Sequence, residues 1–173
     1  CEAAGFDVVM IETVGVGQSE TMVHSMVDCF LLLMLAGAGD QLQGIKRGIM
    51  ELADVVAITK ADGENILAAQ YARSEYQSAL HLMKYPLPGW SPPVLTCSAT
   101  TGAGIEEVWQ GIDTFRETME KSGYLAGKRR DQALSWMHDT IRESIRDRFF
   151  IFMCVDEVVD QIEKKVAEGE RTT

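Results

Sequence analysis

The tetrapeptide Thr59-Lys60-Ala61-Asp62 combines a hydroxyl, an ammonium and a carboxylate within four positions. A carboxylate held in place accepts two hydrogen bonds from adjacent N–H donors, which the Watson–Crick edge of guanine presents and that of adenine does not. A polar site of this kind discriminates sharply, because a missing donor leaves a buried acceptor unsatisfied. The Lys60 stem can lie along a base while its ammonium stays in water. Asp62 is therefore a candidate guanine-binding residue; a solvated polar loop is the alternative.

A second carboxylate, Glu12, ends the apolar run from Phe6, and Gly15 follows three residues later. Mg²⁺ prefers few protein carboxylates and retains several waters, and glycine lets a backbone N–H approach a phosphate oxygen closely. We interpret Glu12 as a candidate metal-site residue and Gly15 as a candidate phosphate contact. A turn with a capping Glu is the alternative.

A third loop, Ser98-Ala99 followed by Thr100-Thr101-Gly102, offers small side chains and backbone N–H groups. Such N–H groups are candidate donors to the carbonyl oxygen of a base. A simple strand-to-helix turn is the alternative here.

These loops follow short apolar runs that are typical of buried strands. The four runs are Phe6 to Glu12, Asp28 to Leu35, Asp54 to Thr59 and Pro93 to Cys97. Helical patterns lie at Gln41 to Leu52, Glu64 to Lys84 and Gly104 to Lys121. Apolar strands that alternate with helices predict an α/β fold with a mostly parallel sheet flanked by helices. Ligands of such sheets bind beyond the carboxyl ends of the strands, where the three loops stand.

From Lys128 to Glu168 the sequence has neither Gly nor Pro, and apolar residues recur at steps of three and four. This spacing predicts a long amphipathic helix. We therefore expect an α/β domain at residues 1–125 and a C-terminal α-helical extension at 126–173. The apolar stripe of the extension packs either on the sheet domain or on a second subunit.

The 173 residues carry 16 basic and 26 acidic side chains, which gives a formal charge of −10. This balance repels a phosphate backbone, so no nucleic acid partner is expected. The longest apolar run, Cys29 to Ala38, is about half of a membrane span, so no membrane partner is expected. The four cysteines have no paired spacing, which indicates reduced thiols in a reducing compartment.

In this order the three loops resemble the later guanine-nucleotide motifs of P-loop GTPases. Three longer strings closely resemble the MeaB/ArgK family, the methylmalonyl-CoA mutase-associated GTPases of the SIMIBI class, also labelled LAO/AO transport system kinases. The strings are ETVGVGQSE (Glu12 to Glu20), AGAGDQLQGIKRGIMELAD (Ala36 to Asp54) and PPVLTCSATTGAGIEEVW (Pro92 to Trp109). The likeness extends from Gly5 to about Trp136.

The resemblance implies a P-loop NTPase-type domain that binds GTP or GDP with Mg²⁺ and hydrolyses the γ-phosphate of GTP. It assigns Glu12 to the metal and Gly15 to the phosphate. The implied base site comprises Thr59, Lys60, Asp62, Ser98 and Ala99. The candidate catalytic residues are Gln18, for contact with the attacking water, and Lys46. Lys46 ends the segment Gly39 to Lys46, which the family uses as an additional switch; a helix start capped by Asp40 is the alternative.

The sequence departs from the family pattern at two places. Thr59 stands where the family usually has Asn, and its hydroxyl can still bridge loops. No G-x-x-x-x-G-K-[ST] phosphate loop occurs, and the chain opens at Cys1. We expect the C-terminal part of a longer protein, and we expect this part alone to bind GTP poorly and to be inactive. Val16, where many small GTPases place Gln, predicts slow unaided hydrolysis in the intact protein.

The resemblance also implies a chaperone of adenosylcobalamin-dependent methylmalonyl-CoA mutase, which gates cofactor loading and protects the mutase. It implies a homodimer formed through the C-terminal helices, located in the cytoplasm, or in the mitochondrial matrix of a eukaryote. The alternatives are an LAO/AO transport-associated ATPase or kinase, a nickel or cobalt metallochaperone, and a non-catalytic interaction or dimerisation module. The sequence has no His or Cys cluster of the kind expected in a metallochaperone.

Overall fold

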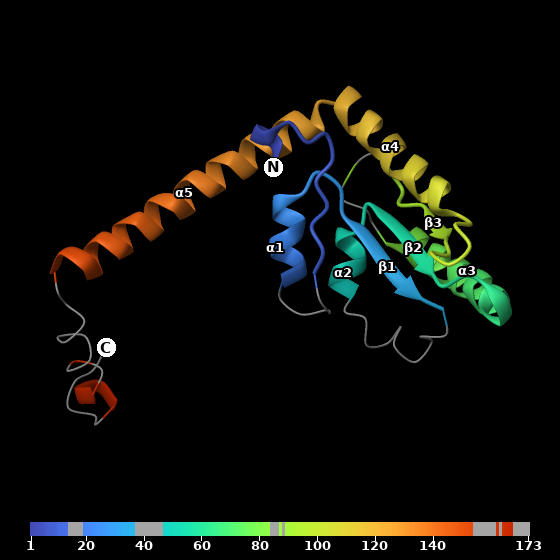
Figure 1. The fold of residues 1–173 in the computed structure, drawn as a ribbon, viewed down its shortest axis with the longest axis horizontal. Coiled ribbons are helices and arrows are strands. Elements are labelled where there is room, and N and C mark those ends of the chain that lie inside the picture. Colours follow the sequence, from blue (N-terminus) through green and yellow to red (C-terminus); the bar gives the residue numbers. More distant parts are fainter. Residues whose placement is uncertain are drawn as a thin grey trace. The chain divides into compact units, whose positions relative to one another are not determined.

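The computed structural model describes residues 1–13, 19–36, 47–83, 87, 89–153, 162 and 164–167. The chain forms two compact units, Cys1–Arg129 and Arg130–Thr173, and each is described by itself. The helices are α1 (Ser19–Met26), α2 (Arg47–Leu52), α3 (Ile66–Leu82), α4 (Ile105–Lys121) and α5 (Tyr124–Met153), with 3₁₀ turns η1 (Glu2–Ala4) and η3 (Gly63–Asn65) (Figure 1). Over these residues, no helix has the length and apolarity that a membrane crossing requires.

Three strands form one parallel sheet in the order β1-β2-β3 (Figure 1). They are β1 (Leu31–Leu35), β2 (Val55–Thr59) and β3 (Val94–Thr96). β1 pairs with β2 from Leu31↔Val55 to Leu35↔Thr59, and Val56 pairs with Val94 of β3. The predicted α/β class, with a parallel sheet flanked by helices and a C-terminal helix, is confirmed. Three of the four predicted strands are present, so the carboxyl ends of β2 and β3 lie at one edge of the sheet.

The two faces of the sheet carry separate apolar clusters because successive strand residues point to opposite sides. Leu32, Val56 and Ile58 belong to one cluster, which includes Met50 of α2 and Tyr76 of α3. Ala57 and Cys97 face the other way and pack with Val108 of α4. The second face is covered only in part, since Leu33 and Leu35 of β1 remain exposed.

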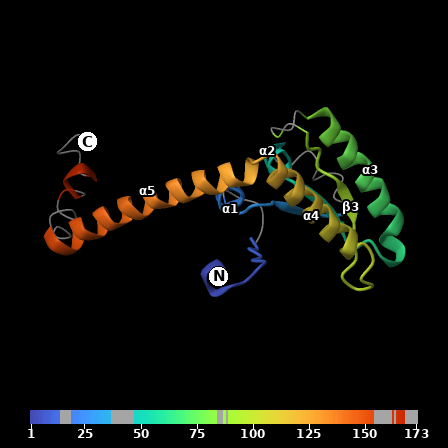
Figure 2. The same ribbon diagram turned by 90° about the horizontal axis from the view of Figure 1, so that it is seen from above.

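The outer edge of β3 is closed by side chains of α3, and Figure 2 shows β3 between α3 and α4. β3 bonds to β2 through alternate residues, since Pro93 accepts from Val56 and Cys97 donates to Ile58. Val94 therefore turns its polar groups away from β2. Arg73 Nε donates to the Val94 carbonyl at 3.0 Å, and the Val94 N–H donates to Gln77 Oε1 at 3.3 Å. Both outward-facing groups of this edge residue are thus satisfied within the chain.

The N-terminal segment differs from the prediction. Phe6 to Glu12 is not a strand, and its side chains are exposed, with Met10 at 81%. An apolar segment becomes a buried strand only where a neighbouring strand forms backbone hydrogen bonds with it. Within the described residues, no strand pairs with this segment. α1 was not predicted, because its eight residues SETMVHSM carry a short apolar pattern. The predicted helix Gln41 to Leu52 is described only from Arg47 onward, as α2.

The first turns of α5 are fixed to the sheet domain by Asp28. Arg129 Nε donates to Asp28 Oδ1 at 2.9 Å, Arg129 Nη2 donates to Asp28 Oδ2, and Lys128 Nζ donates to the Asp28 carbonyl at 3.2 Å. Leu125 is buried in a cluster with Phe115 and Met119 of α4. Burial of Cys29 beside this cluster raises the pKa of its thiol to about 12.

In the second unit, α5 continues to Met153 with an exposed apolar stripe. Its members, spaced mostly three and four residues apart, are Leu134, Met137, Ile141, Ile145 and Phe149. The predicted long helix is confirmed for this stretch. Residues 154–161 lie outside the described part.

Candidate functional site

The end of β2 positions the first residue of the predicted base loop. Thr59 is the last residue of β2, and its Oγ1 donates to the Met34 carbonyl of β1 at 3.0 Å. The hydroxyl at this position therefore ties the loop to the neighbouring strand. The Thr59 hydroxyl was expected to bridge loops, and the bond that it makes joins the ends of the parallel strands β1 and β2.

Lys60 adopts a left-handed backbone conformation, with φ of 57°. Side chains with a Cβ disfavour this region, so the conformation requires support from neighbouring groups. The following N–H, of Ala61, donates to the Cys97 carbonyl at 3.0 Å, and the Lys60 carbonyl accepts from Asn65 Nδ2 at 2.7 Å. The Lys60–Ala61 peptide is thus held at both of its polar atoms, while the Lys60 side chain is exposed.

The Asp62 carboxylate is held by the second loop. Ser98 Oγ donates to Asp62 Oδ2, which joins the loop after β2 to the loop after β3. Ser98 is completely buried, whereas Asp62 is half-buried. A hydroxyl donor at one carboxylate oxygen fixes the orientation of the group and leaves lone pairs for further donors.

The loop after β3 is itself shaped around Ser98. The Ser98 N–H donates to the Ala103 carbonyl at 2.8 Å, and Ser98 Oγ also accepts from the Thr101 N–H at 3.1 Å. Gly104 has φ of 75°, and a Cβ there would lie 2.0 Å from the Thr96 carbonyl oxygen. Glycine is required at this position because the loop passes directly against β3 before α4 begins.

The two loops together present a carboxylate and a backbone donor at one edge of the sheet. Asp62 supplies the carboxylate, and the backbone N–H of the exposed residue Ala99 makes no hydrogen bond among the described residues. This set can accept two adjacent N–H groups and donate to a carbonyl oxygen, which matches the hydrogen-bonding edge of guanine. Burial raises the pKa of the neighbouring Cys97 thiol, so this side chain remains neutral.

The remaining predicted residues lie elsewhere or outside the described part. Glu12 is exposed on the extended N-terminal segment and makes no hydrogen bond or ion pair with described residues. Gly15, Gln18 and Lys46 lie outside the described residues, so their roles stay predictions. Over the described ranges, no group of three or more His, Cys, Asp or Glu side chains could hold a metal ion.

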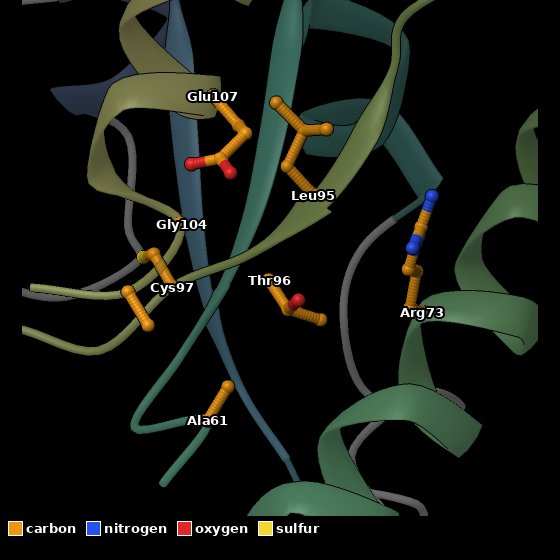
Figure 3. Close-up of a pocket in the computed structure, with 8 residues that line it drawn as sticks. Ala61, Arg73, Leu95, Thr96, Cys97, Gly104 and Glu107 are labelled. Carbon is orange, nitrogen blue, oxygen red and sulfur yellow. The ribbon is translucent and has the colours of Figure 1, made fainter. Parts of the chain in front are cut away.

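A pocket of about 330 Å³ borders this site without containing it. Glu107 of α4 lies on one side and Arg73 of α3 on the other, with Leu95 and Thr96 of β3 between them (Figure 3). Ala61 and Cys97 line it, next to Asp62 and Ser98 in the sequence. The residues predicted to bind a base do not line this pocket.

Asn65 was missed by the sequence analysis, although it contacts the base loop at two atoms. Its Nδ2 donates to the Lys60 carbonyl, and its backbone N–H donates to the Asp62 carbonyl at 2.9 Å. The sequence analysis included this residue in the helical pattern from Glu64 to Lys84 and therefore gave it no role in the loop. The signal that could have found it is an asparagine three residues after Asp62, since asparagine commonly bonds to nearby backbone in turns.

Comparisons with known proteins place this chain among relatives. Residues 1–153 match the family described as methylmalonyl Co-A mutase-associated GTPase MeaB. The GTPase ArgK of Escherichia coli is 49% identical over 150 residues, covering 87% of this chain and 45% of the relative. The mitochondrial methylmalonic aciduria type A homolog of Mus musculus is 46% identical over 169 residues, covering 98% of this chain and 41% of the relative.

A solved structure is also similar. The crystal structure of an LAO/AO transport system kinase has a TM-score of 0.74 and 42% sequence identity, covering 99% of this chain and 55% of that one. The chain therefore spans about half the length of the relatives it matches.

Proposed function

We propose, since this chain belongs to the MeaB family of methylmalonyl Co-A mutase-associated GTPases, that it forms the guanine-recognising part of a GTP-hydrolysing protein. The single observation that carries the proposal is the Asp62 carboxylate, held by Ser98 between the loops that follow β2 and β3. The relatives are named GTPases, which supports guanine-nucleotide binding by the family.

In this proposal each described residue has a limited role. Asp62 accepts the two N–H donors of guanine, Ala99 donates its backbone N–H to the base carbonyl, and Lys60 covers the base with its aliphatic stem. Thr59 and Ser98 position these groups through Met34 and Asp62. The selection of GTP over ATP then follows from unsatisfied acceptors when adenine is present.

We also propose that Glu12 binds Mg²⁺. The carboxylate of Glu12 is a hard oxygen donor of the type that Mg²⁺ accepts, and a single protein carboxylate suits an ion that keeps several waters. Bound Mg²⁺ would offset the negative charge that develops on the phosphates during transfer to water. Gly15 as a phosphate contact, and Gln18 and Lys46 as catalytic residues, complete the proposed site.

The proposed partner is adenosylcobalamin-dependent methylmalonyl-CoA mutase, which the protein would serve as a GTP-driven chaperone for cofactor loading and protection. The family description supports association with a mutase, and the mouse relative is named for methylmalonic aciduria. We place the protein in the cytoplasm; the mouse relative is named mitochondrial. A role in LAO/AO transport is the second candidate, supported by the likeness to the crystal structure of a kinase named for that transport system.

We also propose that the extension at residues 126–173 forms a homodimer arm, appended to the part of the GTPase domain at 1–125. The supporting observation is the exposed apolar stripe on α5, which includes Ile141 and Ile145. An apolar face of this spacing gains stability when a second helix covers it. Charge introduced at Ile141 and Ile145 should halve the molecular mass measured in solution by light scattering, while Arg142→Glu on the same helix should not.

Nucleotide binding tests the central proposal. The full-length protein should bind GDP at least about 100-fold more tightly than ADP, because adenine lacks the two donors that Asp62 accepts. Asp62→Asn should weaken GDP and strengthen xanthosine diphosphate, since the amide donates to the second carbonyl of xanthine. Isothermal titration of each nucleotide into both proteins measures this. Equal affinity for GDP and ADP would contradict the proposal and favour a non-catalytic interaction module.

A further inference from the structure

We infer that Asn65 is a positioning residue for guanine specificity, which acts by holding Lys60 in its left-handed conformation and so fixing the direction of Asp62. The inference rests on the proposed function. It starts from the backbone of Lys60, whose φ of 57° is the only positive value among the described non-glycine residues. Such a conformation is strained for a residue with a Cβ and persists only where the surroundings enforce it.

Two hydrogen bonds enforce it from opposite sides of one peptide. The Cys97 carbonyl accepts from the Ala61 N–H at 3.0 Å, and Asn65 Nδ2 donates to the Lys60 carbonyl at 2.7 Å. The first bond belongs to backbone and is present whatever side chains the loop carries. The second depends on one side chain, so the orientation of the peptide depends on Asn65.

Asn65 also contacts the other end of the loop. Its backbone N–H donates to the Asp62 carbonyl at 2.9 Å. One residue therefore bonds to the backbone on both sides of Ala61, and the Asp62 side chain is in turn held by Ser98. A rotation of the Lys60–Ala61 peptide would move Asp62 away from Ser98.

Asn65 does not act as a helix cap, which is the more common role of asparagine at such a position. Asn65 directly precedes α3, where asparagine normally accepts from the helix N–H groups as a cap. Here its backbone is helical, with φ of −86° and ψ of −5°, and its side chain makes no cap hydrogen bond. The hydrogen bond that the side chain does make is the one from Nδ2 to the Lys60 carbonyl.

The test compares Asn65→Ala with Gln70→Ala in the full-length protein. Gln70 is an exposed amide on α3 whose side chain makes no hydrogen bond among the described residues, so it controls for loss of an amide. Inosine diphosphate lacks the exocyclic amino group of guanine and forms one of the two bonds to Asp62. The ratio of GDP affinity to inosine diphosphate affinity therefore measures how well Asp62 is placed.

Asn65→Ala should reduce this ratio about tenfold, toward one, while Gln70→Ala leaves it unchanged. An unchanged ratio, including equal losses for both nucleotides, would overturn the inference. Failure of the wild-type protein to prefer GDP to ADP would instead overturn the proposed function.

A double-mutant cycle of thermal stability tests, without nucleotide, whether Asn65 holds the backbone conformation of Lys60. This measurement also applies if Asn65→Ala is less stable than the wild type. Glycine adopts positive φ readily, so Asn65→Ala should lower the melting temperature less in the Lys60→Gly background than in the wild type. Equal decreases in both backgrounds would show that Asn65 does not enforce the conformation of Lys60.

Discussion

Gly104 has a positive φ, and it leaves no room for a Cβ where the chain passes against β3. Mutation can separate these two constraints. Gly104→Ala should destabilise the fold by at least about 2 kcal/mol, because it adds a backbone clash to the left-handed strain. Gly123 has a similar φ of 76° with nothing within 4 Å of an added Cβ. Gly123→Ala should therefore cost only about 1 kcal/mol. Urea denaturation of both variants measures the difference, and equal losses would contradict the proximity to Thr96.

Tyr76 buries a hydroxyl that has no hydrogen-bond partner among the described residues. Its ring is 2% exposed within the cluster of the α3 face, and burial raises the pKa of the phenol. Since this hydroxyl gains nothing in the fold, Tyr76→Phe should leave the free energy of unfolding unchanged or raise it by up to about 1 kcal/mol. Tyr71→Phe, at an exposed position, is the control. A loss of more than about 1 kcal/mol at Tyr76 would indicate a partner.

At the level of elements, the attachment of α5 to the loop before β1 is sensitive to pH. The hydrogen bond from Arg129 holds the pKa of Asp28 below its ordinary value, against the opposing effect of burial. A lowered pKa in the folded state means that the stabilisation is present above the unfolded pKa and is lost as the pH falls through the folded pKa. The Asp28 side chain is 37% exposed, so the contribution is at most about 1 kcal/mol.

Thermal denaturation of Asp28→Asn and the wild type tests this dependence. The difference in melting temperature should be largest near neutral pH and should shrink as the pH falls below about 4, where the unfolded carboxylate protonates. Asp131→Asn, at an exposed aspartate of α5, is the control. A difference for Asp28 that stays constant with pH would indicate that packing, and not the ion pair, attaches the helix.

The elements that the sequence predicted correctly are those whose burial depends on local pattern. Val55 to Thr59 is a continuous apolar run and Ile105 to Lys121 has a strong helical periodicity, and both were predicted within about one residue. Phe6 to Glu12 has the same composition as a buried strand, yet its burial depends on a neighbour outside its own pattern. The sequence placed Asp62 and Ser98 at one edge of the sheet, because the ends of parallel strands meet there, but it did not predict the hydrogen bond between them. The left-handed Lys60 did not, because lysine carries no turn signal and a distant carbonyl, that of Cys97, supports the conformation.

For the molecule as a whole, the exposed apolar side chains of the sheet domain predict self-association. Leu33 is 59% and Leu35 49% exposed on the face that α4 covers only in part. Leu33→Thr with Leu35→Thr should reduce binding of the dye ANS and raise solubility without lowering the melting temperature, because these side chains bury little area. Leu32→Thr, on the buried face, should lower the melting temperature. A drop in melting temperature for the exposed pair would show that this face is covered.

The side chains of Arg73 and Gln77 have a consequence for how the sheet can grow. A strand that approached β3 would have to break two existing bonds to Val94 before it formed any of its own. Among the described residues, the outer edge of β1 has no such side-chain hydrogen bonds. The outer edge of β1 is consequently the edge at which we expect this sheet to accept a further strand more readily.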